Sequence, residues 1–183
     1  MKMKLFCLVA LLFSISGYSQ VHLAKIFGDH MVIQRSQAVP VWGWSSPNEK
    51  ITVFINQQVK QTQADKNGKW QVKLDPQPAG GPYDLKVTGR DSLVLHDVLV
   101  GEVWICSGQS NMEFELRQAM HAADEIRDAN YPQIRQIKIP KTVSLAPKED
   151  IPSGEWTVCS PSTAADYTAV GYFFAREIQK RLH

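Results

Sequence analysis

The stretch from Val98 to Met112 places the tightest constraint on the fold. It begins as a continuous apolar run with β-branched residues, which is typical of a strand buried on both faces. The run breaks at Ser107-Gly108, where small residues permit a tight turn. From Phe114 to Ala129 apolar residues recur at helical spacing. The pattern predicts a buried strand, a turn and a helix in succession, as in an α/β domain.

Ser110 lies in the turn between the expected strand and the expected helix. Open α/β sheets usually carry their chemistry at such junctions. A hydroxyl there is held on rigid backbone, and free amide groups at the helix start can stabilise negative charge on an attacked carbonyl oxygen. The alternative is a serine that only caps the helix. Because Asn111-Met112 follows the serine, the motif is not the nucleophile elbow G-x-S-x-G, and the residues alone make Ser110 only a candidate nucleophile.

Residues 1–19 have the pattern of a cleavable secretory signal. Lys2 and Lys4 precede an apolar run from Leu5 to Phe13, and small residues stand before Gln20. The run is too short to span a bilayer. We expect cleavage after Ser19 and a secreted or periplasmic protein, with an uncleaved anchor as the alternative.

The charge of the chain argues against nucleic acid and membrane surfaces as partners. The formal net charge is +2, and loss of the leader removes two lysines and no acidic residue. No basic stripe is present in the remaining sequence. The histidines and cysteines show no metal-ligand spacing, and no glycine-rich phosphate loop occurs, so no cofactor or metal is expected.

Two cysteines, Cys106 and Cys159, remain after the leader. Export would permit a disulfide between them, but their positions in separate segments do not indicate one. Within the expected buried strand, Cys106 is interpreted as a small apolar core residue.

Residues 20–97 alternate short strand patterns with turn signals. The strand patterns are Ile51–Ile55, Trp70–Leu74, Tyr83–Val87 and Ser92–Leu95, and a turn cluster stands at Asp65–Gly68. Strands at this spacing without a helical stretch predict a small antiparallel β-sandwich. Its tryptophans could stack on sugar rings, but their strand positions favour the core for all three: Trp42, Trp44 and Trp70.

Residues 98–183 continue with α/β patterns. A second strand is expected at Ile134–Ile139, and a short extended piece at Glu155–Cys159. A last helix follows, with credible caps at Ser162, Thr163 and Asp166. Its apolar face is formed by Val170, Phe174, Ile178 and Leu182.

This α/β part is too short to cover a layered sheet with helices on both faces. We therefore expect an incomplete α/β domain (98–183) after the leader (1–19) and the β-sandwich (20–97), in a chain that is the front portion of a longer protein. Alone, that part should expose apolar surface. The sequence leaves the oligomeric state open.

Five blocks resemble the sialate O-acetylesterase family of the SGNH hydrolases, in the same order as in that family. They are D-H-M-V-I-Q-R (29–35), P-V-W-G-W (40–44), A-G-G-P-Y (79–83), G-E-V-W-I-C-S-G-Q-S-N-M (101–112) and A-V-G-Y-F-F-A-R-E (169–177). The resemblance covers nearly all of the chain after the leader. It implies an SGNH-type α/β esterase domain, incomplete here, behind the β-sandwich.

The resemblance implies roles for three neighbouring residues. Ser110 would attack the acetyl carbonyl of an O-acetylated sugar, and its backbone amide would contribute to the oxyanion hole. Gln109 and Asn111 would shape the turn or donate nearby. The resemblance thus implies an esterase acting on sialic acids or related glycans. An acetyl-xylan or other sugar-ester esterase is an alternative, and so is a non-catalytic glycan-binding module.

The family's base is a histidine that follows an aspartate by three residues, and no D-x-x-H occurs in this sequence. His121 would lie on the order of 15 Å from the serine along the expected helix and is rejected as a base. His30 is interpreted as structural. The catalytic aspartate and histidine are therefore absent from this chain, and we expect little turnover from it alone.

Overall fold

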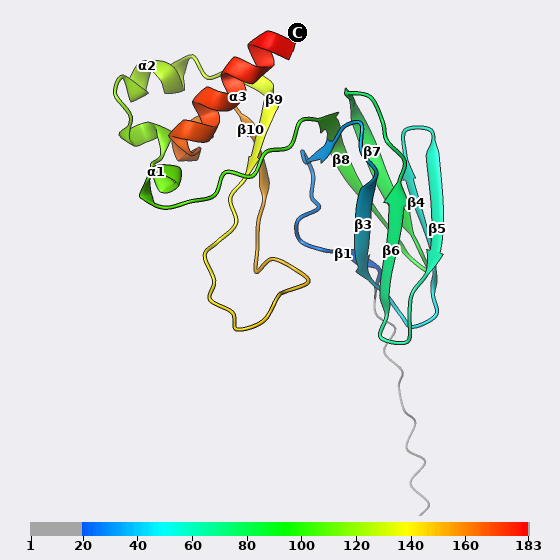
Figure 1. Cartoon of the computed structure of the whole chain (residues 1–183). Coiled ribbons are helices and arrows are strands. Elements are labelled where there is room, and N and C mark those ends of the chain that lie inside the picture. Colours follow the sequence, from blue (N-terminus) through cyan, green and yellow to red (C-terminus); the bar gives the residue numbers. More distant parts are fainter. Residues whose placement is uncertain (1–19, 183) are drawn as a thin grey trace, which may run out of the picture.

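The computed structural model describes residues 20–182, so the expected signal sequence lies outside the described residues. The architecture is mixed α and β, as expected. Two sheets occupy one side of the molecule, and the helices with a two-stranded sheet occupy the other (Figure 1). An extended segment after Gly101 leads from the first part to the second.

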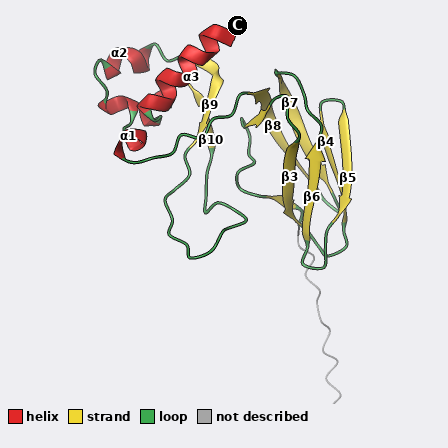
Figure 2. Ribbon diagram, viewed as in Figure 1, coloured by secondary structure: helices red, strands yellow, loops and turns green. Residues whose placement is uncertain are grey.

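Eight strands form the two sheets of the first part (Figure 2). The five-stranded sheet has the order β2-β8-β7-β4-β5, and the three-stranded sheet has the order β1-β3-β6. The strands are β1 (His22–Leu23), β2 (Val32–Gln34), β3 (Val39–Trp44), β4 (Lys50–Ile55), β5 (Gln58–Gln63), β6 (Lys69–Leu74), β7 (Gly80–Thr88) and β8 (Ser92–Gly101). The expected strands are therefore present, but β2 and β8 pair in parallel, so the set is mixed and not purely antiparallel.

One hydrophobic core holds the two sheets face to face. In β6 the side chains of Trp70, Val72 and Leu74 are buried, while the residues between them are exposed. Val53 in β4 and Leu85 in β7 meet them from the other sheet, and both are fully buried. Each such side chain contributes about 1.5–3 kcal/mol by leaving water. The period-two pattern therefore identified the inward face correctly.

The tryptophans divide between the two faces of the three-stranded sheet. Trp70 is 2% exposed and lies in the core, as expected. Trp42 and Trp44 are half-buried and lie on the opposite side of β3 from the buried Val41, so the expectation of core positions was wrong for these two. Gly43 lies between them, and a Cβ there would be 2.0 Å from the backbone oxygen of His22. The close approach of β1 thus requires glycine in the P-V-W-G-W block.

The strand expected to begin at Val98 begins at Ser92 and ends at Gly101. Its last residues belong to the sandwich, because Leu99 pairs with Val32 of β2 and Val98 pairs with Tyr83 of β7. The residues after Gly101 form no strand. The division of the chain at residue 97 stays a prediction, and β8 runs across that point.

The helix expected from Phe114 to Ala129 is not continuous, and the residues from Ser110 to Arg127 instead form three short pieces, the first of which precedes the expected start. They are α1 (Ser110–Glu113), the 3-10 turn η1 (Leu116–Gln118) and α2 (Ala122–Arg127). The first break occurs where Leu116 N donates to Tyr167 O at 2.8 Å and Ala169 N donates to Phe114 O at 2.8 Å. These tertiary bonds hold Phe114 in extended backbone, so they override the local helical pattern.

The remaining elements pack around a second, smaller core. β9 (Tyr131–Ile137) pairs antiparallel with β10 (Trp156–Cys159), and η2 (Ala164–Asp166) leads to α3 (Ala169–Leu182). The two expected extended pieces are thus confirmed. The expected helix caps precede the short η2 turn or lie within it, and α3 begins only at Ala169.

The face of α3 that the sequence marked as apolar is largely exposed. Val170, Phe174 and Leu182 are 45%, 39% and 53% exposed, whereas Ala169 and Tyr172 are buried. The sequence correctly placed these apolar residues on one face of a helix. The rest of the described structure packs against a different face, the one that carries Ala169 and Tyr172. No helix within residues 20–182 is long and apolar enough to cross a membrane.

A charged cluster joins the two parts of the molecule. Asp97 at the middle of β8 accepts hydrogen bonds from Arg135 of β9 at 2.7 and 3.2 Å. His30 Nδ1 lies 2.7 Å from the same carboxylate. Nearby, Trp156 Nε1 donates to the backbone oxygen of Ile26 at 2.8 Å. The expectation that His30 is structural agrees with this position.

Candidate active site

Ser110 is the first residue of α1, and its side chain is exposed to solvent. Gly108, two residues before Ser110, has a φ of 156°, and a Cβ at Gly108 would lie 3.2 Å from Cγ of Met112. Met112 N donates to Gln109 O at 2.9 Å, and Phe114 N donates to Ser110 O at 3.0 Å. The turn therefore holds the serine on ordered backbone with its hydroxyl accessible.

The electrostatic support from a helix is smaller than the sequence suggested. α1 has four residues, so the macrodipole expected from a long helix is not formed. The amides of Ser110 and Asn111 still lie in a first turn, where backbone N–H groups have no intrahelical acceptor. Gln109 caps the turn by its backbone position only, and its side chain makes no capping hydrogen bond. The local donors for an oxyanion are thus these individual amides.

Residues 104–116 rest on the beginning of α3. Trp104 contacts Phe174 edge-on, with ring centroids 5.1 Å apart. Glu115 and Thr168 form an isolated antiparallel bridge. A Cβ on Gly171 would be 3.2 Å from Sγ of Cys106. The serine-bearing block and the A-V-G-Y-F-F-A-R-E block, distant in sequence, therefore lie side by side.

Charged groups next to the serine turn are already paired. Lys141 forms an ion pair with Glu113 of α1. Glu115 accepts hydrogen bonds from Lys138 and Arg117, and these lower the pKa of its carboxyl, with Lys138 contributing most. An ionised carboxylate in two ion pairs is a poor proton acceptor, so Glu115 is not a candidate base.

The histidines within residues 20–182 make contacts that do not involve Ser110. His30 is bound to Asp97, and His96 Nδ1 lies 3.0 Å from Asp84. His22 stacks on Trp44 with centroids 5.4 Å apart. His121 precedes α2 in left-handed backbone, with φ of 58°. Among residues 20–182, none of these interactions includes Ser110, and no three His, Cys, Asp or Glu residues gather to hold a metal.

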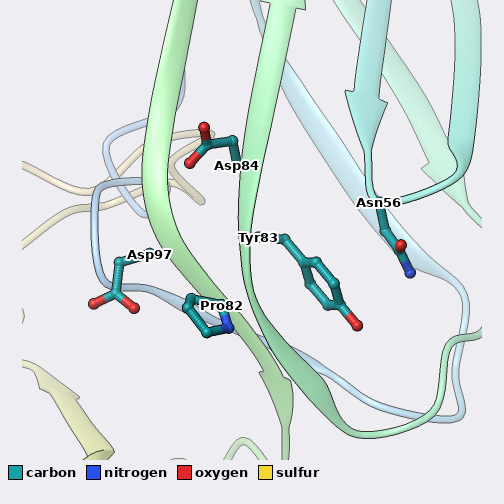
Figure 3. Close-up of a pocket in the computed structure, with 5 residues that line it drawn as sticks. All are labelled: Asn56, Pro82, Tyr83, Asp84 and Asp97. Atoms are coloured by element: carbon teal, nitrogen blue, oxygen red, sulfur yellow. The ribbon is translucent and has the colours of Figure 1, made fainter.

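The part of the apolar run that follows Gly101 is exposed, which corrects the expectation of a buried strand for these residues, although Val98 and Val100 are buried in β8. Val103, Trp104 and Ile105 are 40%, 60% and 92% exposed. Strand burial requires neighbouring strands and covering helices, and none within residues 20–182 pairs with this segment. Two depressions on the surface of the described residues are lined by side chains other than Ser110. The larger one, of about 550 Å³, lies on the sandwich and is lined by Asn56, Pro82, Tyr83, Asp84 and Asp97 (Figure 3).

The two cysteines are free and differ in accessibility. Cys106 is exposed, which overturns its interpretation as a core residue, because its segment has no covering partner. Cys159 is buried, and burial raises the pKa of its thiol to about 11, although a hydrogen bond with the backbone of Tyr131 acts in the opposite direction.

We expect a thiol reagent at pH 8 to label Cys106 more than about 100-fold faster than Cys159 in the folded chain without its leader. The reason is that the reactive thiolate of Cys159 is both scarce and inaccessible. Peptide mass spectrometry after timed labelling measures both rates, and denatured protein serves as the control in which both react. Equal rates in the folded chain, or a disulfide between the two, would contradict the structure.

The chain is similar in sequence and structure to part of several carbohydrate esterases. No family model matches the chain. The sequence is 30% identical over 164 residues to the sialate O-acetylesterase of Pongo abelii, covering 82% of this chain and 31% of that protein. It is 34% identical over 125 residues to the mouse (Mus musculus) sialate O-acetylesterase, covering 61% of this chain and 23% of that protein. The chain thus spans about a quarter to a third of the length of the curated relatives that it matches.

A solved structure agrees with these matches. The crystal structure of a carbohydrate acetylesterase from Xanthomonas citri superposes with a TM-score of 0.87 at 44% sequence identity. The superposition covers 88% of this chain and 38% of that one. The likeness therefore includes both the sandwich and most of the helical part.

Proposed function

We propose that this chain, which is homologous to sialate O-acetylesterases over part of their length, forms the front part of a carbohydrate esterase with Ser110 as its nucleophile. The observation that carries the proposal is the match to the Xanthomonas citri acetylesterase across 88% of the chain. Support comes from the exposed position of Ser110 in an ordered turn. The pattern of residues 1–19 extends the proposal to a secreted or periplasmic enzyme.

In the proposed reaction Ser110 Oγ attacks the carbonyl carbon of an O-acetyl group. A base takes the hydroxyl proton as the new C–O bond forms, because a neutral serine is a weak nucleophile. The tetrahedral oxyanion is stabilised by backbone amides, with that of Ser110 among them and Gln109 and Asn111 beside it. The sugar oxygen then leaves with the proton, and the enzyme carries an acetyl-serine.

Water completes the proposed cycle. The base removes a proton from water, which attacks the acetyl-serine, and acetate leaves as Ser110 regains its proton. Three of the described histidines make their contacts away from the serine turn, namely His22, His30 and His96. We propose that the base belongs to the part of such an esterase that this chain does not match. The same part would cover Val103–Cys106 and α3, which completes an SGNH-type α/β domain.

The proposed substrate is an O-acetylated sugar. The first candidates are O-acetyl esters of sialic acids or related glycans. The relatives at the sequence level are sialate O-acetylesterases, and the similar solved structure is a carbohydrate acetylesterase. An acetyl-xylan or other sugar-ester esterase is the second candidate, since both would use the same serine chemistry.

A hybrid protein tests the proposal. We expect the chain alone to hydrolyse 4-nitrophenyl acetate at close to the uncatalysed rate. A hybrid continued by the part of the Xanthomonas citri enzyme that the chain does not match should be at least about 10²-fold faster, because a positioned acid and base contribute about 10²–10⁴-fold. Absorbance at the released nitrophenolate measures both rates. Equal rates in a hybrid that folds would contradict the proposal.

A further inference from the structure

The outer face of the three-stranded sheet carries a row of aromatic and polar side chains. In β3 the side chains of Trp42 and Trp44 point away from the core, because the buried Val41 and Gly43 alternate with them. In the neighbouring β6, Gln71 lies opposite Trp42 and Lys69 lies opposite Trp44. Aromatic rings on the solvent side of a sheet are not explained by packing of the sandwich.

A depression of about 280 Å³ opens on this face. It is lined by Pro40, Trp42, Lys69, Gln71 and Glu149. Four of these residues come from the sheet, and Glu149 comes from the long connection between β9 and β10. The depression is therefore built by segments that lie far apart in the sequence.

The indole of Trp42 is held in one orientation at this depression. Its Nε1 donates to the backbone oxygen of Glu149 at 3.2 Å. Phe27 contacts the ring edge-on, with centroids 4.8 Å apart. Lys69 Nζ lies 2.6 Å from Glu149 Oε1, which fixes the same connection over the sheet. A ring held in this way loses little conformational entropy when a ligand stacks on it.

We propose that this depression binds a neutral pyranose ring of a glycan, with the ring against the Trp42 indole. Aromatic side chains combine a large apolar surface with a fixed plane, which suits the apolar face of a sugar ring. The Gln71 amide makes no hydrogen bond within residues 20–182, so it offers both donors and an acceptor to sugar hydroxyls. Lys69 and Glu149 offset each other in charge, which favours a neutral ring over an acidic one.

The inference needs neither catalysis nor Ser110, which is not among the residues that line the depression. Trp44 extends the same face two residues along β3, a separation of about 7 Å. A glycan chain lying on this face would contact the second indole as well. The site would hold a sugar through residues other than those of the serine turn, and it would also operate in a chain without esterase activity.

Isothermal titration calorimetry with the whole chain tests the inference. The probes are lactose, cellobiose and xylobiose as neutral sugars and N-acetylneuraminic acid as an acidic one. We expect at least one neutral disaccharide to bind with a Kd of about 0.1–10 mM, and the acidic sugar to bind more weakly. Ser110→Ala should leave this binding unchanged, which separates the inference from the proposed esterase.

Three variants locate the binding. Gln71→Ala should weaken it about three- to tenfold, the loss expected for one or two hydrogen bonds. Trp42→Ala should weaken it by about tenfold or more, while Trp42→Phe, which keeps a ring in place, should retain most of it. Gln61→Ala is the matched control, because Gln61 is an exposed glutamine on β5 of the other sheet.

Several results would overturn the inference. They are the absence of binding by every neutral sugar up to about 10 mM, tighter binding of N-acetylneuraminic acid, or equal effects of Gln71→Ala and Gln61→Ala. Thermal unfolding of each variant shows whether it is folded. Because Gln71 is exposed, its substitution leaves the sheet intact and keeps the test decisive if Trp42→Ala unfolds the chain.

Discussion

In the hybrid esterase, Ser110→Ala should lower kcat for acetyl ester hydrolysis by about 10³- to 10⁶-fold. Alanine removes the only atom of this side chain that can bond to the acetyl carbon, so no acetyl-enzyme can form. What remains is stabilisation by backbone amides, which catalyse weakly without a nucleophile. The substitution should not disturb folding, because the side chain is exposed.

Ser107→Ala is the matched control for this prediction. Ser107 is an exposed serine in the same turn, three residues before Ser110. We expect its substitution to change kcat by less than about threefold, since it loses no more than a weak solvent-exposed hydrogen bond. Initial rates over a range of substrate concentrations separate kcat from KM. Equal hydrolysis by the Ser110→Ala variant and the parent hybrid would remove Ser110 from the mechanism.

The second large effect is a loss of stability, which we expect when Asp97 is substituted. Asp97→Ala should lower the free energy of unfolding by about 3 kcal/mol, because it leaves the guanidinium of Arg135 buried without its partner. The Arg135 side chain is only 5% exposed, and its Nε already lacks a hydrogen-bond partner among the described residues. Urea unfolding followed by tryptophan fluorescence measures the loss.

Asp84→Ala is the control, because Asp84 and its partner His96 are 62% and 64% exposed. An exposed pair of this kind contributes about 0–1 kcal/mol. Similar losses for the two variants would show that the cluster around Asp97 does not hold the molecule together.

The same cluster predicts a pH dependence. Burial acts to raise the pKa of Asp97, but hydrogen bonds and charge from Arg135 and His30 outweigh it and leave the pKa below its ordinary value. A carboxyl with a lowered pKa in the folded state stabilises the protein above its unfolded pKa of about 3.9. That contribution is lost as pH falls from there through the folded value. The stability of Asp97→Ala should accordingly depend less on pH in this acidic range than that of the parent.

Local sequence was sufficient to predict those turns and strands that depend only on residues close together in the chain. The turn at Asp65–Gly68 forms as predicted, because Asp65 Oδ1 accepts hydrogen bonds from the backbone N–H groups of Asn67 at 2.7 Å and Lys69 at 2.9 Å. Gly68 supplies a φ of 81°, which other residues rarely adopt. The strand at Trp70–Leu74 follows from its alternation of apolar and polar residues. These features need no information about distant segments.

The serine turn was located by sequence, but its surroundings were not. Ser110 lies at the start of a helix, as the break at Ser107-Gly108 indicated. The helix is one turn long because residues 114–116 pair with residues 167–169, and no local pattern specifies such a contact. The Asp97 cluster was missed for the same reason, since its members stand far apart in the chain.

The sequence by itself determined which side chains are apolar, where the chain turns and which serine stands at the junction, since these follow from residue type and local spacing. Only the tertiary structure decided what covers each apolar face. Val98 and Val100 are buried because β7 and β2 lie beside them, whereas Ile105 in the same apolar run is exposed because no described strand pairs with it. Burial is a property of two surfaces in contact, and periodicity specifies only one of them.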